Sequence, residues 1–76
     1  MMKYIRLEHA GFVIFEQSQK HADVAQKFPN DTVISAGFVS GTMEEDQIWA
    51  EGQSQSLHKS AKDEDSSWLW RRISIY

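Results

Sequence analysis

The first residues of the chain alternate between polar and apolar positions, a pattern that predicts a β-hairpin. Residues 4–8 show the alternation of a half-buried strand with Ile5 and Leu7 facing inward. Residues 12–15 are apolar on both faces and rich in β-forming side chains, which favours a central strand. The three residues between them include a glycine, which suits a tight turn. The two segments are therefore expected to pair as antiparallel strands.

A helix and a third strand are expected after the hairpin. Ser18 can cap a helix that runs to about Phe28 and ends there, because the residue before Pro29 is pushed out of the helical region. Residues 32–39 then form a strand, in which the small residues 35–37 allow a helix or another backbone to approach closely. One face of the predicted helix carries His21, Val24, Ala25 and Phe28.

The segment after the third strand is open to two interpretations. Thr42 with Glu45 resembles a capping box, which would start a helix through Ala50. Against this, the side chains from 48 onward alternate at strand period, and the glycine and the serine–glutamine run that follow are poor helix formers. We favour a second hairpin, with residues 47–57 as a strand that has one face of small residues.

The C-terminal segment is equally ambiguous, between an edge strand and a helix. The tryptophans and isoleucines favour a strand on propensity alone. Ser60 followed by Asp63 matches a capping box, however, and the acids before residue 66 and the arginines after residue 70 suit the two ends of a helix dipole. The sequence thus predicts a helix over residues 61–73.

Together these elements predict one α+β domain over residues 1–76, in the order ββαββα. The simplest packing is a four-stranded antiparallel sheet with two helices on one face. A domain of 76 residues buries only about 60% of the surface of its unfolded chain, and without cysteine it has no disulfide to reinforce it. We therefore expect self-association, with a homodimer as its simplest form.

The residue pattern gives no support to catalysis, a metal or a cofactor. The chain lacks cysteine and a nucleophile elbow, its three histidines show no ligand spacing, and its four glycines form no phosphate-binding loop. No catalytic, metal or cofactor residue is therefore expected, and the chain is predicted not to be an enzyme. Without a signal peptide or an apolar run long enough to span a membrane, the cytosol is the expected location and no membrane contact is expected.

The three tryptophans are more than so small a core needs. Four phenylalanines already compete for its interior, and on a helix Trp68 and Trp70 lie about 200° apart, so they cannot both face the sheet. Tryptophan and arginine are enriched in interface hot spots. We therefore predict a protein-interaction module that binds itself or another protein. Its candidate interaction residues are Trp49, Trp68, Trp70, Arg71, Arg72 and Tyr76.

An alternative hypothesis is single-stranded nucleic-acid binding through the C-terminal tryptophans and arginines, which could stack bases and meet phosphates. The net charge of −3, and the acids Asp63, Glu64 and Asp65 beside these cations, make a nucleic-acid partner the less favoured one.

Overall fold

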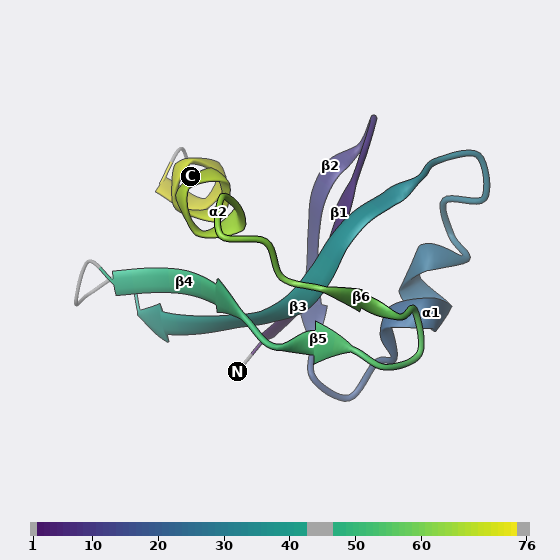
Figure 1. Ribbon diagram of the computed structural model, residues 1–76, viewed down its shortest axis with the longest axis horizontal. Helices are drawn as coiled ribbons and strands as arrows, with labels where there is room; N and C mark the ends of the chain where they lie inside the picture. The colour runs from purple at the N-terminus through teal and green to yellow at the C-terminus, as the bar shows by residue number, and fades with distance from the viewer. Residues whose placement is uncertain (1, 43–46, 75–76) are drawn as a thin grey trace.

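The computed structural model describes residues 2–42 and 47–74, which form a twisted sheet, a small ribbon and two helices (Figure 1). The elements, in chain order, are β1 (Met2–Leu7), β2 (Gly11–Glu16), α1 (His21–Ala25), β3 (Val33–Thr42), β4 (Gln47–Glu51), β5 (Gln53–Ser54), β6 (Lys59–Ser60) and α2 (Asp65–Ser74). The predicted four-stranded antiparallel sheet with two helices is confirmed. Its strand order is β2-β1-β3-β4, so β2 and β4 are the edges.

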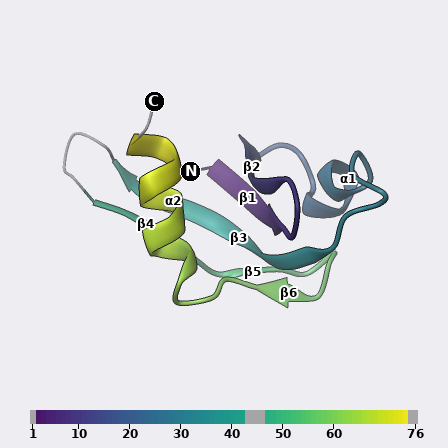
Figure 2. The same cartoon turned by 90° about the horizontal axis from the view of Figure 1, so that it is seen from above.

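The two helices pack on opposite faces of this sheet, whereas the sequence analysis placed them on one. Strand β1 lies between them, and its side chains alternate between the two faces. Ile5 and Leu7 pack with Val24 of α1, while Tyr4 and Arg6 on the other face contact Asp65 of α2. Both views show α1 and α2 separated by the β1–β2 pair (Figures 1 and 2). The difference arises because Tyr4 is as fully buried as Ile5, so this strand is covered on both sides.

The main hydrophobic core lies between α1 and the sheet. It is formed by Ile5, Leu7, Phe15, Val24 and Ala36. The second layer, between α2 and the sheet, is thinner and includes the fully buried Leu69. A protein of this size thus divides its apolar side chains between two small cores.

Helix α1 is shorter than predicted, with five residues instead of a run from Ser18 to Phe28. Its N-cap is Lys20, which makes no side-chain capping hydrogen bond. The predicted face is nevertheless correct, because His21 and Val24 are buried on it. Packing rather than capping therefore defines this helix, which is common for helices too short to be stable alone.

The strand predicted over residues 47–57 is interrupted at Gly52. This residue has a φ of 77°, in the left-handed region that favours glycine, and it separates β4 from β5. The chain then forms a two-stranded ribbon, β5–β6, which lies against β3 (Figure 1). The ribbon is closed by the N–H of Ala61, which donates to the carbonyl of Gly52 over 3.0 Å.

Helix α2 begins four residues later than predicted. Ser60 lies in β6 and does not cap the helix; instead the Asp65 carboxylate accepts a hydrogen bond from the backbone N–H of Lys62, three residues earlier. This is the acidic half of a capping box, two residues further along the chain than the predicted pair of Ser60 and Asp63. The interpretation of residues 61–73 as a helix rather than an edge strand is confirmed.

The small residues of β3 do allow a close approach, as predicted. A Cβ added at Gly37 would lie 2.6 Å from the backbone oxygen of Glu51 and 3.2 Å from the Cβ of Ala61. The segment that leads from the ribbon to α2 can therefore pass over β3 only because residue 37 has no side chain.

Replacing Gly37 with alanine is expected to destabilise the fold by about 1–3 kcal/mol, because backbone atoms must move to accept the methyl group. Urea unfolding measures the change. Gly11→Asn is the control, since nothing lies within 4 Å of its Cβ position and asparagine tolerates the positive φ found there. Equal stability of Gly37→Ala and the wild type would contradict this packing.

Candidate functional site

A buried carboxylate joins α2 to the sheet. Asp65 is fully buried and accepts a hydrogen bond from the hydroxyl of Tyr4 at 2.5 Å and one from Nη1 of Arg6 at 3.1 Å. The same Arg6 nitrogen lies 3.2 Å from the carboxylate of Glu64, which is exposed. With the Lys62 N–H at 3.0 Å, three donors surround one buried charge. The helix therefore docks in a single position relative to β1.

This environment shifts the pKa of both titratable partners. Burial by itself would raise the pKa of Asp65, but the hydrogen bonds from Tyr4, the Lys62 N–H and Arg6 outweigh that effect and hold the pKa below its usual value. Burial raises the pKa of Tyr4 far above its usual value, and the hydrogen bond to Asp65 adds to the rise. Tyr4 is thus a neutral donor and Asp65 an anion at neutral pH. Because both Tyr4 and Asp65 are fully buried, their contact is structural in character.

A row of alternating aromatic and cationic side chains extends from this group to the surface. The guanidinium carbon of Arg6 lies 5.6 Å from the ring centre of Phe12 and 5.8 Å from that of Trp68. The guanidinium carbon of Arg71 lies 5.4 Å from the Trp68 ring. Trp68 is 46% exposed, so cation–π contacts hold an indole at the surface on the α2 side of the sheet.

Trp49 is also exposed, at 40%, but it belongs to the opposite face. It lies on β4 opposite Ser40, and its indole N–H donates to the carboxylate of Glu51 at 2.9 Å. The hydroxyl of Ser40 donates to the other oxygen of Glu51 at 2.6 Å. The structure therefore does not bring Trp49 and Trp68 into one patch.

The remaining candidate residues are distributed along α2 and beyond it. Trp70 is half-buried, and Arg71 is exposed beside Trp68. Arg72 is a residue of helix α2, and Tyr76 lies outside the described residues. Of the six predicted interaction residues, Trp68 and Arg71 are thus the pair for which the structure gives a mutual contact.

The outer edge of β2 is a feature that the sequence analysis missed. Phe12, Val13 and Ile14 are only half-buried there, although they were expected in a central strand. Within the described part of the chain, no backbone hydrogen bond links the outer side of residues 12–15 to another segment. The other edge differs, because the N–H of Ala50 in β4 donates to the Ser66 hydroxyl of α2 at 2.9 Å. One edge of the sheet is covered and the other is open.

The histidines do not assemble a metal site in the described residues, where no group of three or more potential ligand side chains comes together. His21 is buried between the rings of Phe15 and Phe38, and its Nε2 donates to the carbonyl oxygen of Gly37 at 2.9 Å. This is a hydrogen-bonded core histidine.

Comparison with protein-family models, curated proteins and solved structures found no match to this chain. None of the helices in the described residues has the length and apolar character needed to cross a membrane.

Asp65→Asn is expected to lower the free energy of unfolding by about 3 kcal/mol, because it leaves Arg6 facing a neutral amide in a buried site. Glu64→Gln is the matched control: it removes the exposed partner of the same guanidinium and should lower the free energy of unfolding by less than about 1 kcal/mol.

The contribution of Asp65 to stability also depends on pH. Since its folded pKa lies below the unfolded value of about 3.9, the contribution is complete above that value and is lost as pH falls through the folded pKa. Urea unfolding between pH 7 and pH 2 tests this, and the idea fails if Asp65→Asn loses as much stability on acidification as the wild type.

Proposed function

We propose that this chain is a protein-interaction module that forms a homodimer by pairing the β2 strands of two copies. The observation that carries the proposal is the open β2 edge. Every second residue of an edge strand directs its N–H and C=O groups away from the sheet, where they are a template for another strand. Strand β2 has six residues, close to the usual length of a paired strand.

The composition of β2 supports a strand partner rather than exposure to solvent. Natural edge strands are usually protected by lysine, proline or a bulge. The four residues between Gly11 and Glu16 are all apolar, and the register between β1 and β2 is unbroken from Met2 to Leu7. The edge is therefore regular, apolar and unprotected, the properties that favour β-strand addition.

A second copy is the partner that best fits this edge. Two β2 strands related by a two-fold axis run antiparallel, so the same edge serves both copies. Phe12 and Ile14 share the α2 side of the sheet with Tyr4 and Arg6, their partners in β1. Pairing of two copies would bring these half-buried side chains beside their equivalents and enlarge the small core on that side.

Trp68 lies at the margin of the same surface. Through Arg6 it is connected to Phe12, and so to the β2 edge. An exposed indole in contact with two guanidinium groups is pre-ordered, which lowers the entropic cost of contact with a partner. We therefore assign Trp68 and Arg71, with Phe12 and Ile14, to the proposed dimer surface.

Nucleic-acid binding is the less favoured function for this face. Arg6 and Arg71 both lie over the Trp68 ring, so they compete with a base for its π-surface. Protein binding requires no such competition. We further propose the cytosol as the site of action, since a chain without cysteine suits a reducing compartment.

The first test is light scattering across a concentration series, in which the wild type is expected to be a dimer. Ile14→Lys should shift the equilibrium to monomer, because the two-fold axis brings like charges together at the edge. Ile14→Glu should also be monomeric, and an equimolar mixture of the two variants should dimerise again. A wild type that remains monomeric at high concentration, or variants that dimerise as well as the wild type, would overturn the proposal. Circular dichroism checks that each variant is folded.

A comparison of the two exposed tryptophans locates the interface. Trp68→Ala is expected to raise the dimer dissociation constant about tenfold or more, which corresponds to about 1.4 kcal/mol. Trp49→Ala removes an equally large and similarly exposed ring from the opposite face and should change the constant less than twofold. Light scattering or analytical ultracentrifugation gives both values. The assignment of the α2 side is wrong if Trp49→Ala weakens the dimer as much as Trp68→Ala.

A further inference from the structure

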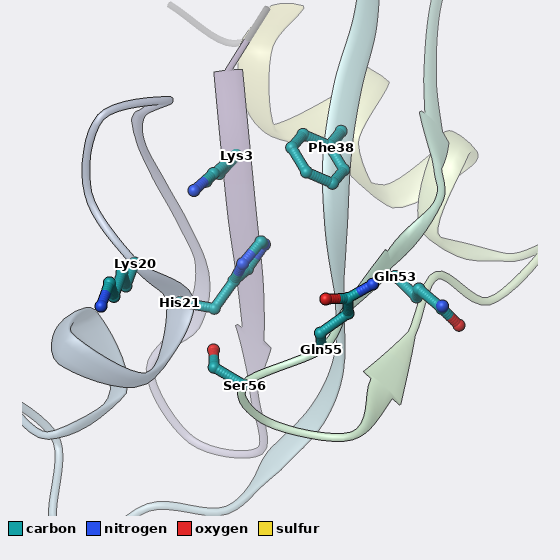
Figure 3. A pocket seen from close by; sticks show the side chains of 7 residues that line it. All are labelled: Lys3, Lys20, His21, Phe38, Gln53, Gln55 and Ser56. Atoms are coloured by element: carbon teal, nitrogen blue, oxygen red, sulfur yellow. The ribbon is translucent and has the colours of Figure 1, made fainter.

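A pocket on the α1 side of the sheet carries positive charge on a protein that is negative overall. Helix α1 is only five residues long and leaves part of this face uncovered. The uncovered part contains a cavity of about 380 Å³ (Figure 3). Its lining comes from β1, the start of α1, β3 and the β5–β6 ribbon: Lys3, Lys20, His21, Phe38, Gln53, Gln55 and Ser56.

The cationic side of this pocket is formed by two lysines. The ammonium of Lys3 donates to the backbone oxygen of Gln19 at 2.7 Å and lies 6.0 Å from the centre of the Phe38 ring. One of its three N–H groups is used in this way, which leaves two for a ligand. Lys20 lines the same pocket, and none of the lining residues is acidic. Glu51, which pairs with Phe38 across β3 and β4, accepts hydrogen bonds from Ser40 and Trp49.

The other side of the pocket is apolar at its base and rich in hydrogen-bonding groups at its rim. Phe38 is half-buried, and the His21 ring meets it edge-on at 5.6 Å. Because His21 is already bonded to the Gly37 carbonyl, its ring is held in place. Gln53, Gln55 and Ser56 add amide and hydroxyl groups that can hydrogen-bond a ligand. An apolar base with a few polar groups is the usual composition of a small-molecule site, and the volume lies within the usual range of about 300–1,000 Å³.

We infer that this pocket binds a small organic anion, with a carboxylate or phosphate group between Lys3 and Lys20 and a compact apolar body against Phe38. The site lies on the face opposite Trp68, so it is independent of the proposed dimer surface. Binding requires the lysines for the charge and Phe38 for the body of the ligand. A ligand that lacks either part is expected to bind more weakly.

Phenyl phosphate and benzoate are suitable probes, because each combines a ring with one of the two anionic groups. In an NMR titration of the full chain, at least one of them is expected to shift the signals of His21 and Phe38 with saturation in the millimolar range or below. Whichever binds more tightly identifies the anionic group. Benzyl alcohol, which has the ring without the charge, and inorganic phosphate, which has the charge without the ring, should each bind at least about fivefold more weakly.

Lys3→Gln and Lys20→Gln should each raise the dissociation constant about fivefold, the effect of losing one charge-assisted hydrogen bond at a partly exposed site. Lys27→Gln is the control, since it changes the net charge equally at an exposed position outside the pocket. The inference is overturned if neither aromatic anion binds, if Lys27→Gln weakens binding as much as the pocket variants, or if inorganic phosphate binds as tightly as phenyl phosphate. Light scattering of Lys3→Gln should still show the wild-type oligomer, so failure of this site and failure of the dimer are separate results.

Discussion

The ion pair between Asp65 and Arg6, completed by the hydroxyl of Tyr4, is the interaction on which the arrangement of this small protein depends. Burial of a carboxylate lowers the free energy of unfolding by several kcal/mol unless its charge is compensated. Asp65, Arg6 and Tyr4 must therefore come together when the protein folds. Once they do, α2 has one position over the sheet. That position places Trp68 over Arg6 and Ser66 beside the edge of β4. One buried charge thus determines both which edge is covered and which aromatic ring is presented to solvent.

Much of the secondary structure could be predicted because it depends on local patterns. The β1–β2 hairpin follows from alternation and a glycine turn, and α2 was recognised from the acids and arginines at its two ends, although its strand-forming residues pointed the other way. The start of α2 was misplaced because Asp65 contacts Lys62 and the sheet at the same time. A capping pattern in the sequence cannot show that one acid also has a partner 61 residues away.

The arrangement of the sheet could not be predicted in the same way. A hairpin pattern does not say which of its two strands will pair with a third, and here β3 pairs with β1, so that the more apolar strand β2 is left at the edge. The alternation that placed Ile5 and Leu7 inward put Tyr4 and Arg6 on the other face, yet the contact with Asp65 buries Tyr4 fully and Arg6 partly. The candidate sites could not be predicted for the same reason, because they depend on which distant segments lie side by side. The pocket joins Lys3, Phe38 and Gln55 across three distant segments, and no spacing in the chain relates them.

The break at Gly52 limits how many copies could join by the proposed strand pairing. Had β4 continued straight, the residues after Glu51 would have paired with the first half of β3 and lengthened the β4 edge; instead the chain turns at Gly52, and the β5–β6 ribbon packs against β3. With Ser66 covering β4, β2 is the edge of the four-stranded sheet that remains available in the described residues. A sheet open at both ends can add copies without limit and grow into a fibre. A sheet open at one end is complete after a single symmetric pairing, so under the proposed pairing the bend at one glycine would separate a finite assembly from an endless one.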